Sequence, residues 1–252
     1  MLWNPDKYRK FKAQRAEPFK DLAALLIVKP GLKVIDLGCG TGELTAELAV
    51  MLPGSDVTGI DSSGEMIDKA RPLERPGLKF RLGKIEEVSG LWDLIFSNAA
   101  LHWIEDHHAF IPCLLSMLND GGQLLVQMPS NHRNRAQQAV AEIAAAEPHL
   151  SALSGWRWDF PALPIDTYAE ILYQHGGSEM VIFDKVYPHV LDSAEDVMEW
   201  LSGTTIIPYL ERLPERLNDD FRQDCLERLR ELYPDGPFLF PFRRILFSAV
   251  KP

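Results

Sequence analysis

Residues 34–42, VIDLGCGTG, constrain the fold of this 252-residue chain more than any other segment. Their apolar, partly β-branched start predicts a buried strand, and glycine at every second position then predicts a tight turn before a helix. The spacing is Gly-x-Gly-x-Gly, which differs from the Gly-x-Gly-x-x-Gly of dinucleotide-binding loops, and no lysine follows as in phosphate-binding loops. A turn of this kind lies at the carboxyl end of a strand, where α/β folds bind their ligands.

Short strands and helices alternate through the first half of the chain. Apolar patterns predict strands at residues 33–37, 57–60, 78–82, 94–97 and 123–128, and helices at residues 18–28, 43–52, 63–70 and 106–118. A helix at residues 168–174 and two strands at residues 180–190 and 242–250 complete the pattern. This alternation predicts a doubly wound α/β fold with a mostly parallel, seven-stranded sheet.

The pattern changes after Pro129. Residues 129–165 and 188–240 are rich in helix signals, among them the capping-box candidate Ser193-x-x-Asp196. We expect these two stretches to be insertions that meet over the sheet edge as a helical cap. They would then belong to one domain that spans residues 1–252, rather than forming a domain of their own.

Charge and cysteine content exclude several classes of protein. The chain has 36 acidic and 26 basic residues, which excludes nucleic-acid coating but still allows a local basic pocket for a small anion. No window approaches the ~18 to 20 apolar residues of a membrane span, and the polar N-terminus lacks the apolar core of a signal peptide. The cysteines Cys39, Cys113 and Cys225 form no Cys-x-x-Cys pair, which argues against a disulfide framework and indicates the reducing cytoplasm. Cys113 and Cys225 fall on helical stretches, where we expect inert thiols. The sequence leaves the oligomeric state open.

A second acidic residue, Asp61, ends the predicted strand at residues 57–60. Its carboxylate is suited to accept both hydroxyls of a ribose, or it caps the helix that follows. Together with LWDLIFSNAALHW at residues 91–103 and GGQLLVQMP at residues 121–129, these motifs resemble the class I S-adenosylmethionine-dependent methyltransferases. The resemblance covers residues 1–128 and implies a Rossmann-like fold with S-adenosyl-L-methionine as the cofactor.

The resemblance also implies roles for individual residues. Gly38, Gly40 and Gly42 would border the methionine part of the cofactor, Asp36 would help hold its amino group, and Asp61 would hold its ribose. The other cofactor-binding candidates are Tyr8, Arg15, Met66, Ile85, Glu86 and Asn98. Tyr8 and Arg15 would close over the cofactor, and Met66 would lie near the adenine. Lys84 stands where an adenine-binding acid is expected, so either Glu86 or the backbone around Ile85 would take its place.

A closer resemblance extends over the whole chain. Residues 97–103 (SNAALHW), 200–210 (WLSGTTIIPYL) and 240–243 (FPFR) are similar to carboxyl methyltransferases of the trans-aconitate family, as are Trp3, Pro18 and Tyr233-Pro234. That family methyl-esterifies one carboxylate of an unsaturated tricarboxylic acid. His102 departs from the glutamine expected before the tryptophan. The implied partner is a small-molecule carboxylic acid, with no nucleic acid and no membrane.

Methyl transfer to a carboxylate needs little acid–base chemistry, because a carboxyl group of pKa ~4 is already ionised at neutral pH. The site then needs a clamp for the acceptor's carboxylates, and arginine suits this role because its planar fork binds them bidentately. The substrate-binding candidates are Arg133, Arg157, Tyr209 and Arg243. Arg244 is a further arginine at this place, and neighbouring strand residues point to opposite faces, so only one of Arg243 and Arg244 would face the cavity.

His102 and Trp103 are the candidate catalytic residues, because they follow the strand whose end would abut the transferred methyl group. His102 would donate a hydrogen bond to the substrate, act as a base, or simply pack in the core. Trp103 and Tyr209 would wall the site or belong to the core. With His107 and His108, His102 forms no compact ligand set, so we expect no metal, and we expect both later histidines to be exposed.

Three other functions fit parts of the sequence. One is a methyltransferase for another small acid or a hydroxylated metabolite, since malonyl-thioester methyltransferases share the Ser-Asn-x-x-x-x-Trp pattern. Another is a non-catalytic S-adenosylmethionine-binding or dimer-forming regulator, which the intact glycine loop disfavours. The third is a nicotinamide dehydrogenase, which the glycine spacing disfavours.

Overall fold

The computed structural model describes residues 12–130, 134–158 and 160–252, with side chains described from Glu17 onward. The described residues form two compact units. The sheet unit contains Arg15–Pro129, Pro161–Lys185 and Arg244–Pro252. The helical unit is built mainly from Ser130–Phe160 and Val186–Arg243. None of the helices in this part of the chain is long and apolar enough to cross a membrane.

The central feature is a seven-stranded sheet with the order β3-β2-β1-β4-β5-β7-β6. Its strands are β1 (Lys33–Leu37), β2 (Asp56–Asp61), β3 (Leu78–Leu82), β4 (Trp92–Asn98), β5 (Leu118–Pro129), β6 (Ser178–Leu191) and β7 (Phe238–Val250). Strands β1 to β5 pair in parallel, whereas β7 runs antiparallel to β5. The prediction of a mostly parallel, seven-stranded α/β sheet is confirmed.

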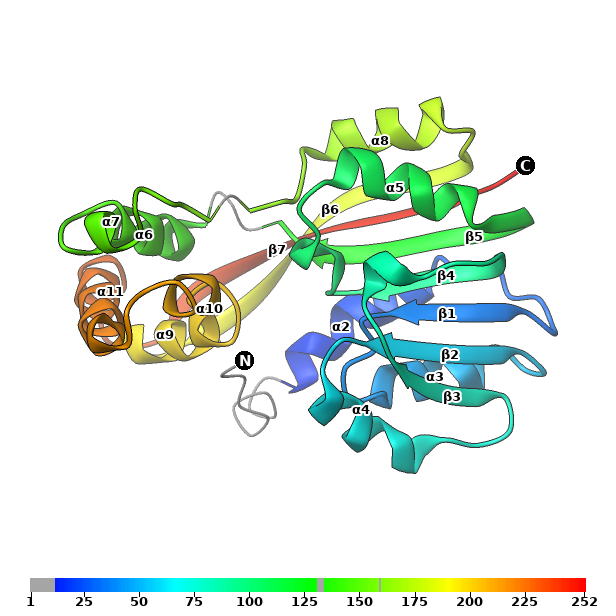
Figure 1. The fold of residues 1–252 in the computed structure, drawn as a ribbon, viewed down its shortest axis with the longest axis horizontal. Helices are drawn as coiled ribbons and strands as arrows, with labels where there is room; N and C mark the ends of the chain where they lie inside the picture. Colours follow the sequence, from blue (N-terminus) through cyan, green and yellow to red (C-terminus); the bar gives the residue numbers. More distant parts are fainter. Residues whose placement is uncertain (1–11, 131–133, 159) are drawn as a thin grey trace. The chain divides into compact units, whose positions relative to one another are not determined.

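Helices cover both faces of this sheet in the sheet unit. They are α2 (Lys12–Ala23), α3 (Glu43–Met51), α4 (Gly64–Ala70), α5 (His107–Ser116) and α8 (Ile165–Gln174), with short 3-10 turns at η1 (Arg71–Leu73), η2 (Ile85–Glu87) and η3 (Leu101–Trp103). Leu246 of β7 packs in one core cluster with residues of α2, α3 and α4. Its neighbour Phe247 stacks on Tyr168 of α8 at 5.1 Å, and α8 lies beside α5 (Figure 1). Because adjacent strand residues point to opposite faces, the sheet is doubly wound.

The first helix differs from the prediction of residues 18–28. It begins earlier, at Lys12, with Pro18 inside it, and it ends at Ala23. The side chain of Gln123 explains the early end, because its Oε1 accepts a 3.1 Å hydrogen bond from the Ile27 N–H and its Nε2 donates a 2.8 Å bond to the Leu25 carbonyl. This distant side chain satisfies backbone groups that a longer helix would have paired internally.

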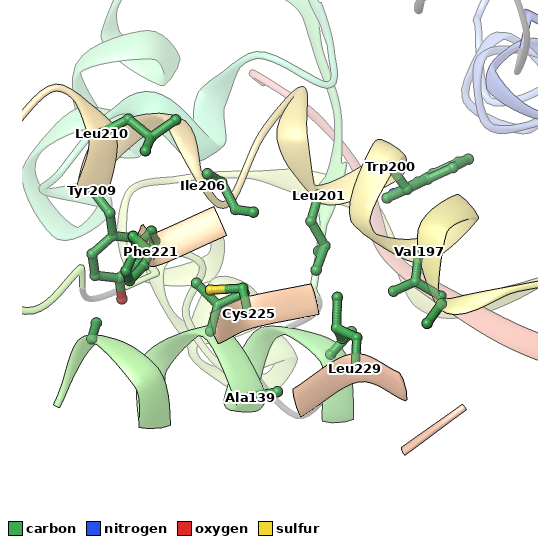
Figure 2. Packing of buried hydrophobic residues seen from close by; sticks show 14 of the residues in the cluster. Ala139, Val197, Trp200, Leu201, Ile206, Tyr209, Leu210, Phe221, Cys225 and Leu229 are labelled. Atoms are coloured by element: carbon green, nitrogen blue, oxygen red, sulfur yellow. The ribbon is translucent and has the colours of Figure 1, made fainter. Parts of the chain in front are cut away.

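The helical unit has a core of its own. Its helices are α6 (Arg135–Ala144), α7 (His149–Ala152), α9 (Ala194–Ser202), α10 (Ile207–Leu210) and α11 (Asn218–Leu232), with a 3-10 turn η4 (Glu215–Leu217). Tyr209 and Phe221 pack against each other with ring centroids 5.5 Å apart, and Trp200 lies at the other end of this core (Figure 2). Ser193 caps α9 as predicted, since its Oγ accepts from the Asp196 N–H at 3.2 Å. The return bond differs from a capping box, because Asp196 Oδ2 accepts from the N–H of Asp192, one residue before the cap, at 3.2 Å.

Candidate active site

The glycine loop is anchored to the carboxyl end of the neighbouring strand β2. The N–H groups of Gly38 and Cys39 both donate to the Ile60 carbonyl, at 2.9 and 2.8 Å. The Gly40 N–H donates to Asp61 Oδ2 at 2.9 Å. Three consecutive backbone N–H groups of the loop are therefore bonded to residues at the end of β2.

The three loop glycines are required for different reasons. Gly38 and Gly42 have φ values of +78° and +76°, and a Cβ added to them would lie 2.2 Å from Ala100 Cβ and 2.6 Å from the Phe80 ring. Gly40 also has a positive φ, +55°, but no described atom lies within 4 Å of an added Cβ. Packing therefore demands Gly38 and Gly42, whereas Gly40 leaves open space in which a ligand can approach the backbone.

Asp36 places a buried carboxylate beneath this loop. Its side chain is 3% exposed, and Oδ2 accepts a 2.6 Å hydrogen bond from the Thr45 hydroxyl. Oδ1 has no hydrogen-bond partner among the described residues. Burial raises the pKa of Asp36 from 3.8 to about 7, the Thr45 hydrogen bond lowers it, and the negative charge of Asp61 raises it further. A cationic group at Oδ1 would satisfy this atom and favour the ionised form.

Asp61 braces the loop and the start of α4. Besides the bond from Gly40, its Oδ1 accepts from the Ser63 N–H at 2.9 Å. Ser63, rather than Asp61, caps α4, since its hydroxyl accepts from the Met66 N–H. Asp61 is half-buried, and each carboxylate oxygen has a second lone pair for a further donor such as a ribose hydroxyl.

The remaining cofactor candidates of the sheet unit surround the same loop to different degrees. Met66, in the first turn of α4, is half-buried. Ile85 is also half-buried, and its Cδ1 would lie 3.6 Å from a Cβ on Gly38. Glu86, in η2, is exposed. Ile85 is therefore against the loop, whereas the Glu86 side chain faces solvent. Tyr8 lies outside the described residues, and the side chain of Arg15 is not described.

A chain of polar side chains crosses the carboxyl ends of β4 and β5. Asn98 Oδ1 accepts a 2.7 Å hydrogen bond from Gln127 Nε2. Gln127 is fully buried, and its Oε1 accepts a 2.7 Å bond from Arg244 Nη1. Arg244 is 6% exposed, whereas Arg243 is exposed and falls in the helical unit. Gln127 was not among the predicted site residues, although a glutamine within the apolar strand LLVQMP is a signal that could have identified it.

His102 and Trp103 follow directly in η3. His102 is 5% exposed, and burial lowers its pKa to about 3, with the positive charges of Arg244 and His107 acting in the same direction. His102 is therefore neutral at physiological pH, and it can form hydrogen bonds but is a weak base. Trp103 is 46% exposed, and its ring lies 4.9 Å from that of His102.

The expectation that His107 is exposed is wrong. It is 1% exposed, and it bridges the Leu101 carbonyl, 2.8 Å from its Nε2, and the Tyr168 hydroxyl at its Nδ1. Tyr168 comes from α8, far along the chain, and this helix covers the start of α5. His108 is exposed as expected. The described residues contain no group of three side chains arranged to hold a metal ion.

The other substrate candidates lie in the helical unit or outside the described residues. Arg157 is exposed, and Arg133 is outside the described ranges. Tyr209 is 2% exposed in the core of the helical unit, where its ring lies 5.5 Å from that of Trp156. Burial raises the pKa of Tyr209, and its hydroxyl forms a hydrogen bond with the Trp158 backbone, which lowers the pKa in part.

Comparisons with known proteins identify the family. Residues 28–175 match a family model described as a methyltransferase domain. Relatives named trans-aconitate 2-methyltransferase occur in Deinococcus radiodurans, at 40% identity over 100% of this chain and 99% of the relative, and in Rhizobium etli, at 35% identity over 100% of both. The chain belongs to the methyltransferase family that contains these trans-aconitate 2-methyltransferases.

Solved structures share the fold at low identity. A putative methyltransferase from Bacillus halodurans matches with a TM-score of 0.59 and 16% identity, over 93% of this chain and 98% of that one. A phosphoethanolamine N-methyltransferase from Haemonchus contortus, solved with S-adenosylhomocysteine, matches with a TM-score of 0.57 and 17% identity, over 94% of this chain and 52% of that one. At these identities the similarity supports the α/β fold alone.

Proposed function

We propose that this protein transfers a methyl group from S-adenosylmethionine to a carboxylate of trans-aconitate. Relatives at 35–40% identity over the full chain carry the name of that activity. The observation that carries the proposal is the buried Asp36 carboxylate, with its unpaired Oδ1, beside the open space at Gly40. This arrangement fits the amino group and backbone-contacting part of the cofactor's methionine.

The described residues around the loop fit the cofactor. S-adenosylmethionine supplies, when bound, an electrophilic methyl group on a sulfonium. Asp36 would hold the amino group through Oδ1. Burial raises the pKa of Asp36 to about 7, and the positive charge of the amino group would favour its ionised form. Asp61 would accept the ribose hydroxyls while it braces the Gly40 N–H. The side chains of Met66 and Ile85 would cover the adenine.

The acceptor requires orientation rather than activation. A carboxylate of pKa ~4 carries its negative charge at neutral pH, so no residue has to remove a proton from it. The neutral state of His102 agrees with this requirement, because a neutral imidazole can donate a hydrogen bond to a substrate oxygen. Holding the two groups in line in a site that excludes water can supply as much as roughly 7–11 kcal/mol of the barrier.

Several assignments remain proposals. Arg133, Arg157, Arg243 and Tyr209 are proposed to contribute to acceptor binding, and Tyr8, Arg15, Glu86 and Asn98 to cofactor binding. We propose that residues 129–165 and 188–240 select the substrate as a cap within one methyltransferase domain. Their support is the continuous core that the two stretches share. A cytoplasmic location is proposed on the three cysteines, all of which are free thiols.

A labelled-methyl assay tests the proposed function. The purified protein would be incubated with methyl-labelled S-adenosylmethionine and a panel containing trans-aconitate, cis-aconitate, citrate and a malonyl thioester. We expect a base-labile methyl ester on trans-aconitate with the highest kcat/KM of the panel. Asp36→Asn should lose cofactor affinity and activity together, while exposed Asp56→Asn, the same charge change on β2, should lose neither.

Two results would contradict the proposal. Labelling of another acceptor with a higher kcat/KM would replace trans-aconitate as the substrate. Tight binding of the cofactor with no acceptor labelled would indicate a protein that binds S-adenosylmethionine without catalysis.

A further inference from the structure

A buried arginine lies at the carboxyl end of β5. Arg244 of β7 pairs in register with Pro129, the last residue of β5, and its side chain is 6% exposed. We propose that Arg244, with its guanidinium oriented by Gln127, binds a carboxylate of the methyl acceptor and thereby selects polycarboxylate substrates. This inference deepens the proposed function and rests on it for the identity of the acceptor.

Gln127 fixes the direction of the guanidinium. Gln127 is fully buried, and both ends of its amide form hydrogen bonds. Gln127 Oε1 accepts from Arg244 Nη1 at 2.7 Å, and Gln127 Nε2 donates to Asn98 Oδ1 at 2.7 Å. The backbone is tied at the same place, since the Ala99 N–H donates to the Gln127 carbonyl at 2.8 Å. A planar fork held in this way loses little freedom when it binds a carboxylate, which favours affinity.

The same polar chain adjoins the glycine loop. The four strands involved are neighbours in the sheet, in the order β1-β4-β5-β7. Gly38, at the end of β1, lies so close to Ala100 that a Cβ on it would be 2.2 Å from Ala100 Cβ. Ala100 follows Asn98 by two residues, and Asn98 bonds Gln127. Contacts therefore run without a gap from the cofactor loop to the network that orients Arg244.

Charge chemistry explains why an arginine would be buried there. The protein has a formal net charge of −10, so its overall field repels a tricarboxylate. A buried guanidinium attracts an anion more strongly than an exposed one does, because solvent screens its charge less. His102, whose pKa is lowered in part by the charge of Arg244, adds a polar group without adding charge.

The alternative is that Arg244 has only a structural role, in which its hydrogen bond to Gln127 links β7 to β5. If Arg244 is only structural, replacing it should lower the melting temperature, the cofactor affinity and the acceptor affinity together. A carboxylate-binding arginine would affect acceptor affinity selectively. Measuring melting temperature, cofactor affinity and acceptor affinity on the same variants therefore separates the two roles.

Three substitutions form the test. Arg244→Gln removes the charge, and Arg244→Lys keeps the charge but removes the fork. Gln127→Glu keeps Arg244 and places a carboxylate against it, so an internal ion pair would occupy the guanidinium; the Asn98 amide can rotate to donate to the new side chain. The matched control is Arg71→Gln, because the Arg71 side chain is 65% exposed on η1 in the same unit.

Acceptor binding would be measured in two ways. One is the KM for trans-aconitate in the labelled-methyl assay, and the other is calorimetric titration of trans-aconitate into protein saturated with S-adenosylhomocysteine. We expect Arg244→Gln and Gln127→Glu to raise both constants by roughly tenfold to a hundredfold, as for a lost charge-assisted hydrogen bond. Arg244→Lys should give a smaller increase, and Arg71→Gln none. The melting temperature of Gln127→Glu should stay close to the wild-type value, and any loss of cofactor affinity, which could arise through its partner Asn98, should be much smaller than the loss of acceptor affinity.

The outcomes separate this inference from the proposed function. Unchanged acceptor affinity in Arg244→Gln, or a loss only in parallel with cofactor affinity and melting temperature, would overturn the role of Arg244. If Arg244→Gln does not fold, Gln127→Glu and Arg244→Lys decide by the same criteria. If the wild-type protein binds trans-aconitate without methylating it, the proposed function is refuted, but the carboxylate-binding role of Arg244 is not. If the wild-type protein binds none of the polycarboxylates, the carboxylate-binding role of Arg244 is refuted.

Discussion

The Thr45 hydroxyl donates a 2.6 Å hydrogen bond to Asp36, and in this way α3 holds the Asp36 carboxylate, which lies buried under the glycine loop. Thr45 occupies only Oδ2, so the protein sets the orientation of the carboxylate while Oδ1 has no hydrogen-bond partner among the described residues. The arrangement makes the pKa of Asp36 sensitive to whether a cation is bound beside it.

The stability of the ligand-free protein should therefore depend on pH through Asp36. Its pKa is raised from 3.8 to about 7 on folding, so its neutral form is favoured in the folded state. The stability contribution is fully present below about pH 4 and is lost as pH rises toward 7. Asp36→Asn should remove this dependence and raise the free energy of unfolding at pH 8 by on the order of 2–4 kcal/mol. Denaturant unfolding of the wild type and Asp36→Asn at a series of pH values measures this dependence of the free energy of unfolding.

Cofactor binding should show the opposite dependence on the same group. Because an amino group is bound by the ionised carboxylate, the affinity for S-adenosylhomocysteine should increase as pH rises through about 7. Calorimetry of the wild type and Asp36→Asn checks this. An identical pH profile in the two proteins would assign the dependence to another group.

Gly40 and Gly42 should respond differently to alanine. Gly40→Ala should cost ~1 kcal/mol of stability for the positive φ, because the added Cβ meets open space, yet it should strongly weaken cofactor binding. Gly42→Ala should cost about 2–4 kcal/mol, because its Cβ would lie 2.6 Å from the Phe80 ring and 2.8 Å from Ala70. Thermal unfolding together with cofactor titration separates the two effects. Equal losses of stability would contradict the difference in their surroundings.

Replacing His102 by glutamine should leave the pH dependence of the reaction unchanged. Its pKa is lowered to about 3, so it does not change charge between pH 5 and 8 and cannot supply a kinetic pKa in that range. Glutamine retains a hydrogen-bond donor of similar reach. We expect kcat/KM of His102→Gln to stay within about one order of magnitude of the wild type, as for one neutral hydrogen bond. A pH profile that loses an inflection near 6.5 would show that His102 titrates during catalysis.

The cap of α9 should contribute to the stability of the helical unit. Ser193→Ala removes the acceptor of the Asp196 N–H and should cost about 0.5–2 kcal/mol. Ser193→Thr, which retains a hydroxyl that can both accept and donate, is the matched control and should cost much less. Urea unfolding followed by tryptophan fluorescence measures the difference in stability, since Trp200 lies in the same helix. Equal stability of the alanine and threonine variants would show that the cap contributes nothing.

Local patterns were sufficient to predict most of the sheet unit. The segment at residues 34–42 predicted β1, the turn and the start of α3, because strand burial and glycine conformation are both local properties. The predicted strand at residues 78–82 coincides with β3 for the same reason. The exact ends of other elements depended on distant groups, as Gln123 shows for the end of α2.

Features that depend on distant pairing could not be read from local patterns. The burial of His107 depends on Tyr168, and the burial of Arg244 depends on its register with Pro129 across an antiparallel strand pair. Sequence alone indicated that only one of Arg243 and Arg244 would face inward. The candidate it named, Arg243, is exposed, whereas Arg244 is buried. A glutamine within an apolar strand signals a buried polar contact, but the sequence could not show that the partners of Gln127 are Asn98 and Arg244.

The core of the helical unit has a consequence for protein engineering. Ala139 of α6 comes from residues 130–160, whereas Phe221, Cys225 and Leu229 of α11 come from residues 186–243, and all four belong to one apolar cluster. A chimaera that exchanges only one of these segments with a relative would set side chains against a surface they did not evolve with. Exchanges meant to alter acceptor preference should therefore move both segments together, with the junctions placed at the unit boundaries.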